Sequence, residues 1–82
     1  MKRFYFDIRE DDEIIPDEEG LELLELRAVQ AEAAKSLADV ARDAVHSFLP
    51  GNGGHRMAIE VRDASGPVMQ VQVILEVKKL RR

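Results

Sequence analysis

The sequence predicts an α+β fold in which one long amphipathic helix packs on one face of a mainly antiparallel four-stranded sheet, in the order ββαββ. Two observations lead to this prediction. Segments in which apolar and polar residues alternate stand at both ends of the chain, and the segment 25–48 between them has helical periodicity. All 82 residues are assigned to one domain, because a chain of this length supports only a single small core.

The first two strands are predicted at 3–9 and 13–16. The earlier one alternates between an apolar and a polar side, formed by Phe4, Phe6 and Ile8 and by Tyr5, Asp7 and Arg9. Acidic residues form the turn, and Pro16 ends the second strand because it has no N–H to donate. Gly20 is expected to close the next turn, and 21–24 is interpreted as an apolar connection to the helix.

The helix is predicted over 25–48. Its apolar stripe, flanked by Val29 and Ala41, consists of Leu26, Ala33, Leu37, Val40, Ala44 and Phe48. The opposite side is charged and is expected to face solvent. Pro50 and the glycines after it end the helix and are interpreted as a flexible connector.

The last two strands are predicted at 55–62 and 67–79, joined by the turn Asp63-Ala64-Ser65-Gly66. This turn has the composition of a type I turn closed by a glycine bulge. The register that it sets brings three apolar pairs to one face: Val61 with Met69, Ile59 with Val71, and Met57 with Val73. The other face is expected to meet water and carries Ala58, Glu60, Arg62, Gln70 and Gln72.

The last strand is predicted to extend beyond its partner. Because 55–62 cannot cover it past about Leu75, either the first strand or a second copy is expected to pair with its far end. Ile74 lies on the polar side of this strand, and together with Tyr5 it is a candidate self-association patch. The basic run 78–82 is interpreted as a charge guard against aggregation.

Nine acidic residues and no basic residue lie between Glu10 and Glu25. They lack the alternate-position loop with a central glycine that an EF-hand requires. We interpret this segment as a solvated acidic loop, and leave open whether it binds anything. No metal and no cofactor is predicted.

No catalytic residue is predicted either. The two histidines, His46 and His55, are too few for a metal centre, and no serine lies in a motif with a histidine and a carboxylate. The glycines at 51–54 lack the Lys-Ser/Thr of a phosphate loop. We therefore expect a protein that is not an enzyme.

The expected location is the cytoplasm. The chain has no cysteine, so nothing points to an oxidising compartment. Met1-Lys2-Arg3 is followed at once by a short aromatic strand with an aspartate, which does not fit a signal peptide. The charged residues are too frequent for a membrane span, and no membrane partner is predicted.

Several segments resemble a family of short proteins of unknown function from rhizobial and related α-proteobacteria. The likeness lies in the aromatic opening 3–9, in 14–23 with its turn Pro16-Asp17-Glu18-Glu19-Gly20, in the alanine-rich 31–34 and in 59–63. Such proteins tend to carry Pro-Asp before the helix, where this chain has Leu24-Glu25. The resemblance implies no activity.

The leading hypothesis is a non-catalytic interaction module of unknown process that forms a homodimer or binds another protein. Its candidate interaction residues are Tyr5, Ile74, Lys78, Lys79, Arg81 and Arg82. The alternative is a small nucleic-acid-associated regulator, similar to antitoxins, that uses the basic C-terminal tail. Lys2 and Arg3 would join that tail if the first and last strands were neighbours.

Overall fold

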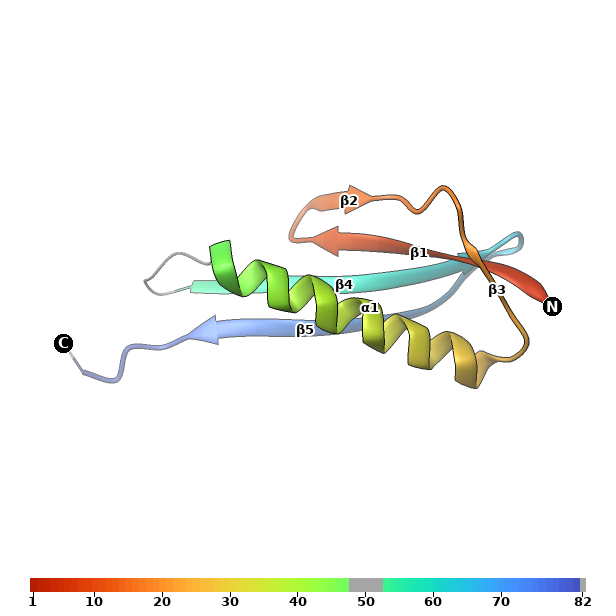
Figure 1. Cartoon of the computed structure of the whole chain (residues 1–82). Helices are drawn as coiled ribbons and strands as arrows, with labels where there is room; N and C mark the ends of the chain where they lie inside the picture. Colours follow the sequence, from red (N-terminus) through yellow and green to blue (C-terminus); the bar gives the residue numbers. More distant parts are fainter. Residues whose placement is uncertain (48–52, 82) are drawn as a thin grey trace.

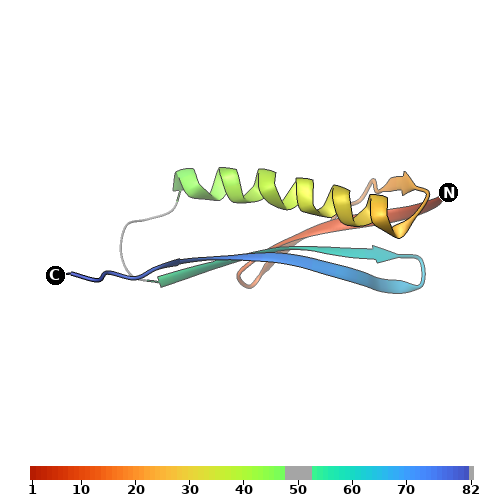
Figure 2. The same cartoon turned by 90° about the horizontal axis from the view of Figure 1, so that it is seen from below.

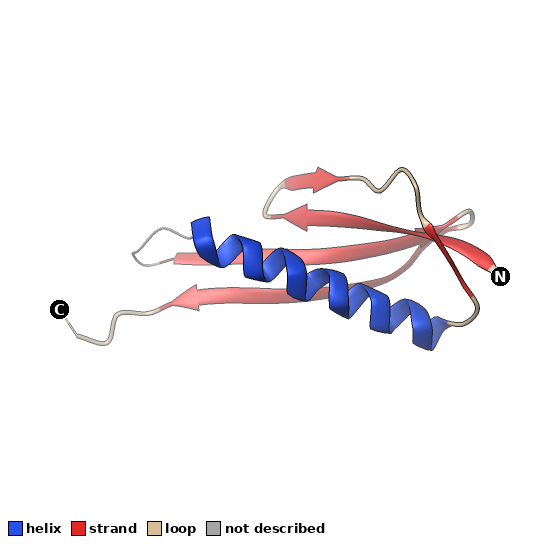
Figure 3. Ribbon diagram, viewed as in Figure 1, coloured by secondary structure: helices blue, strands red, loops and turns tan. Residues whose placement is uncertain are grey.

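The computed structural model describes residues 1–47 and 53–81, with side chains described up to Ala44 and from His55 on. It has two layers, one helix and one sheet (Figures 1, 2 and 3). The elements are β1 (Lys2–Glu10), β2 (Glu13–Ile15), β3 (Leu21–Leu23), α1 (Leu26–Ser47), β4 (Gly53–Asp63) and β5 (Gly66–Val77).

The sheet confirms the predicted α+β class and antiparallel pairing, but it has five strands, not four. Its order is β2-β1-β4-β5, and β3 pairs with the beginning of β1. The segment 21–23, interpreted from the sequence as a connection, forms the additional strand opposite residues 2–4. Three residues are too few to show the alternation by which strands are recognised, so only the pairing reveals this strand.

The β4–β5 hairpin has the predicted register. Val61 pairs with Met69, Ile59 with Val71 and Met57 with Val73, and Gly66 has a φ of +123° that an L side chain rarely adopts.

The ends of these two strands differ from the prediction. β4 begins at Gly53, where glycines suggested a connector, and Gly53 pairs with Val77 at the end of β5. The partner strand therefore covers β5 along its whole length, and the expected uncovered far end is wrong. Pro50 and Gly51 lie outside the described residues.

The core lies between α1 and the central strand β4. Phe4 belongs to this core and is 4% exposed. The core side chains that are at most 1% exposed are Val29, Ala33, Met57, Ile59 and Val61. Leu37 and Val71 pack against this cluster, as the predicted apolar stripe and sheet face require.

Two predicted positions are wrong. Leu26 was assigned to the buried stripe but is 58% exposed, whereas Val29, assigned to its flank, is enclosed. Ala58 was assigned to the solvent face but is enclosed, because its cross-strand neighbours Arg9 and Gln72 carry much longer side chains. Phe48 lies outside the described residues.

The helix crosses the strands diagonally (Figure 1). Its first half projects beyond the outer edge of β5, and its second half runs over β4 toward β1. This direction explains why Leu26, in the first turn, has no sheet beneath it. It also leaves every residue of β5 only partly buried or exposed. Among the described residues, no helix combines the length and apolar character that crossing a membrane requires.

The position of the core predicts different costs for the same small change at two isoleucines. Ile59→Val removes a methylene from the enclosed centre and should lower the free energy of unfolding by about 1 kcal/mol. Ile74→Val, at a side chain that is 58% exposed, should leave it nearly unchanged. Urea unfolding followed by circular dichroism measures both, and equal losses would contradict this core.

Candidate functional site

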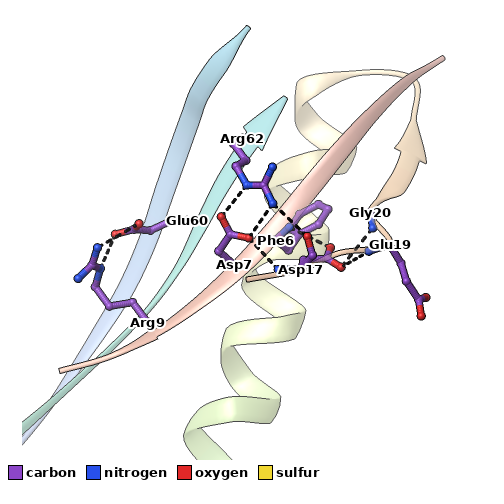
Figure 4. Close-up of polar contacts among 8 residues, drawn as sticks. All are labelled: Phe6, Asp7, Arg9, Asp17, Glu19, Gly20, Glu60 and Arg62. Carbon is purple, nitrogen blue, oxygen red and sulfur yellow. Dashed lines mark hydrogen bonds and ion pairs between the residues drawn. The ribbon is translucent and has the colours of Figure 1, made fainter. Parts of the chain in front are cut away.

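The outer face of the sheet, opposite α1, carries charged side chains that are paired across strands (Figure 4). Arg9 Nε donates to Glu60 Oε2 at 2.7 Å, and Arg62 Nε donates to Asp7 Oδ2 at 2.8 Å. The guanidinium of Arg62 also lies 4.5 Å from the centre of the Tyr5 ring. Among the described side chains, no buried nitrogen or oxygen lacks a hydrogen-bond partner.

These pairs account for the shifted pKa values on this face. The hydrogen bond from Arg9 lowers the pKa of Glu60, burial opposes it, and a hydrogen bond from Gln70 adds to the lowering. The pKa of Arg62 is raised chiefly by its hydrogen bond to Asp7. Each shifted group already has a protein partner, which is typical of a structural ion-pair network.

Asp17 stands at the edge of β1 that faces away from β4 (Figure 4). The backbone N–H of Phe6 donates to its Oδ2 at 3.1 Å, and the N–H groups of Glu19 and Gly20 donate to its Oδ1 at 3.0 and 3.1 Å. Its own N–H donates to Asp7 Oδ1 at 2.8 Å. The carboxylate thus both closes its own turn and occupies a place in the hydrogen-bonding edge of β1.

The electrostatics of Asp17 follow from these contacts. Burial raises the pKa of its carboxyl, but the N–H donors of Phe6, Gly20 and Glu19 and the charge of Arg62 outweigh burial and hold the pKa below its usual range.

Gly20 is required in the same turn. Its φ is +73°, and a Cβ there would lie 2.9 Å from side-chain carbons of Arg3 and Tyr5. The turn Pro16-Asp17-Glu18-Glu19-Gly20 can therefore lie against the edge of β1 only with glycine at its last position.

The outer edge of β1 is closed along most of its length. β2 pairs with residues 8–10, β3 pairs with residues 2–4, and Asp17 accepts the N–H of Phe6 between them. The segment 13–23 thus acts as one interrupted strand. An edge closed in this way leaves few N–H and C=O groups with which a further strand could pair.

The outer edge of β5 has no neighbouring strand among the described residues. Because Phe6 donates away from β4, strand alternation points the backbone of Tyr5, Asp7 and Arg9 toward β4. The same alternation, carried through β4, directs the odd-numbered residues of β5 to β4. The N–H and C=O groups that face the open edge belong to Gln70, Gln72, Ile74 and Glu76.

The structure separates Tyr5 from Ile74. Both belong to the outer face, but Tyr5 pairs with Arg62 and Ile74 pairs with Arg56, six residues away along β4. That is about 20 Å at the rise of a strand. Ile74 is exposed beside the open edge, whereas Tyr5 is half-buried under Arg62. The two residues do not form one patch.

The basic residues at the two termini also lie apart. β4 stands between β1 and β5, and Lys2 lies at the opposite end of the sheet from the segment after β5 (Figure 1). Lys2 pairs with Asp63 at 3.0 Å, and Lys78 pairs with Glu76 at 3.3 Å. Lys79 and Arg81 are exposed. Arg82 lies outside the described residues.

The acidic turn between β1 and β2 is attached to β4. The N–H of Asp11 donates to the carbonyl of Arg56 at 2.9 Å, and Asp11 Oδ2 lies 3.1 Å from His55 Nδ1. In the part of the chain that the structure describes, no group of three or more His, Asp or Glu side chains could hold a metal ion. The side chain of His46 lies outside the described residues.

The sequence predicted that Gly20 closes a turn and that Gln70 and Gln72 of β5 face solvent, but it did not reveal the role of Asp17. A signal was present, since Asp followed three residues later by Gly is typical of a turn in which the carboxylate accepts backbone N–H groups. What the sequence does not contain is the position of that turn beside Phe6, which depends on how β2 and β3 pair with β1.

Asp17→Ala should lower the free energy of unfolding by about 1–3 kcal/mol, because three backbone N–H groups lose their acceptor. The neighbouring residue Glu18 is exposed and provides the control. Glu18→Ala should change the free energy of unfolding by less than about 0.5 kcal/mol. Chemical unfolding compares the two. In addition, amide exchange of Phe6 should accelerate in Asp17→Ala alone.

The protein should be less stable in acid. The folded-state pKa values of Asp17, Glu60 and Asp63 lie below the ordinary values of 3.8 for Asp and 4.5 for Glu. Their contribution is complete above the ordinary values and is lost as the pH falls through the folded-state values. The urea midpoint should therefore be lower at pH 3 than at pH 7. An unchanged midpoint would contradict the assigned pairing.

Comparison with known proteins identifies the family without assigning an activity. No curated protein and no solved structure matches the chain. The model of a domain of unknown function, DUF6894, matches residues 3–74, which include the helix and all strands except Lys2 at the beginning of β1 and the end of β5. This match confirms the resemblance to a family of unknown function, while the bacterial origin stays a prediction. The chain belongs to the DUF6894 family.

Proposed function

We propose that this protein is a non-catalytic interaction module that accepts a β-strand from a protein partner at the open edge of β5. The observation that carries the proposal is the difference between the two edges of the sheet. β1 is closed by β2, Asp17 and β3, whereas β5 is paired on one side only in the described chain. Main-chain hydrogen bonds supply affinity in this mode of binding, and alternate side chains supply specificity.

The open edge is suited to an added strand. β5 is 12 residues long, and its side chains alternate between half-buried and exposed from Met69 to Val77. Exposed edge strands of this length are normally blocked by proline, inward charges or bulges. Here Pro67 and the irregularity beside it lie at the beginning of the strand, and the segment 69–77 contains none of these devices.

The alternative, binding of nucleic acid through the basic tail, has less support. Lys2 and Arg3 lie at the far end of the sheet, and Lys78 is paired with Glu76. The outer face carries matched ion pairs, and Tyr5 is stacked against Arg62. Stacking of bases requires an accessible aromatic face.

Amide exchange and a single proline test the proposal. In the dilute protein, the amides of Gln70, Gln72, Ile74 and Glu76 should exchange fast, and those of Val71, Val73 and Leu75 should exchange slowly. Peptides selected from a random displayed library should have alternating apolar residues and should protect the fast set.

The variant Gln72→Pro, compared with Gln72→Ala, tests whether the peptides pair with the backbone of β5. It removes an N–H that faces the open edge and leaves the β4–β5 ladder intact, so the protein should fold and lose the selected peptides. Gln72→Ala, the control, should retain them. Peptides that bind Gln72→Pro as well as wild type, or that protect β1 instead, would contradict the proposal.

A further inference from the structure

We infer that the partner at the β5 edge is a second copy of this chain, paired antiparallel, so that two sheets join into one with both helices on the same side. This inference rests on the proposed function, because it names the strand that occupies the open edge. Three features of the described residues support it: the backbone phase of β5, the diagonal position of α1 and the distribution of charge.

The backbone phase of β5 is compatible with antiparallel self-pairing. In such a pair, opposite residues share a face and a hydrogen-bonding direction. When even-numbered residues lie opposite even-numbered residues, the outward N–H and C=O groups of Gln70, Gln72, Ile74 and Glu76 meet their counterparts. The same alignment places the half-buried Val71, Val73 and Leu75 of both copies on one apolar face beneath the helices.

The diagonal helix makes the two halves of the edge complementary. The first half of α1 projects beyond the beginning of β5, with Leu26 58% exposed, and it borders a hollow of about 580 Å³ that Met69 also lines. Among the described residues, no helix lies over the second half of β5, which leaves Val73, Leu75 and Val77 half-exposed. A twofold axis near Gln72 brings the projecting half-helix of each copy over the uncovered half-strand of the other.

The surface of α1 that projects beyond the edge of β5 carries small side chains. Ala31 and Ala34 line the same hollow, and both are exposed, as is Ala38 one turn further on. In the antiparallel pair the two helices run side by side along these positions. Small side chains allow the axes of two helices to approach closely, so these exposed alanines are suited to a contact between two helices.

Charge favours the same arrangement. The segment that leads into the projecting end of α1 carries the exposed Glu25, and the segment that leaves the uncovered end of β5 carries the exposed Lys79 and Arg81. The twofold axis brings the acidic segment of one copy to the basic segment of the other. Parallel pairing would place like charges together instead.

Light scattering after size exclusion tests the inference with four variants. Wild type and Gln72→Ala should be dimers, and Gln72→Pro should be a folded monomer. The double variants Gln72→Lys/Ile74→Lys and Gln72→Glu/Ile74→Glu place like charges across the twofold axis, so each should dimerise about tenfold more weakly than wild type. A mixture of the two should recover dimer affinity, because opposite charges then face each other.

The outcomes separate this inference from the proposed function. If wild type is a monomer whose β5 edge is protected by selected peptides, the second copy is wrong and the interaction module stands. If Gln72→Pro remains a dimer, or mixing the oppositely charged variants does not restore affinity, pairing through β5 is overturned. A monomer that binds no peptide at β5 overturns both.

Discussion

Burial of one face of β4 beneath α1 is the constraint on which the rest of the structure depends. Met57, Ile59 and Val61 are at most 1% exposed, and β4 pairs with β5 from Gly53 to Asp63 and with β1 from Met57 to Arg62. Because β4 is central, its backbone alternation determines that of β1 and β5. The phase of one apolar strand thereby decides which backbone groups face each edge of the sheet and which side chains form the outer ion pairs.

The two edges differ because the chain returns to β1 and not to β5. The acidic segment after β1 forms β2, a turn around Asp17, and β3, all beside β1. Asp17 accepts N–H groups both within its own turn and from β1, so this edge is satisfied by a side chain where strand pairing is interrupted. At least one acidic residue of this segment, Asp17, therefore has a structural role.

The sequence predicted the fold class, the hairpin register and the apolar side of β5 because these depend on local alternation and on one turn, Asp63–Gly66. It did not predict β3, which is too short for a pattern, or the strand start at Gly53, where composition opposes the pairing that tertiary structure provides. The exposure of Leu26 was missed for a different reason. Periodicity identifies the apolar side of a helix, but the angle at which the helix crosses the sheet decides which turns lie over strands.

One closed edge and one open edge determine what kind of assembly β5 can enter. A sheet with two open edges can add strands without limit, which leads to fibres. Among the described strands, the outer edge of β1 is occupied by β2, Asp17 and β3, so each copy offers a single open edge, that of β5. Antiparallel pairing of that surface with itself uses both copies' open edges at once and leaves none free, which is the closure that a twofold interface provides. The turn around Asp17 would then limit assembly to two copies, although it lies on the side of the sheet opposite the contact.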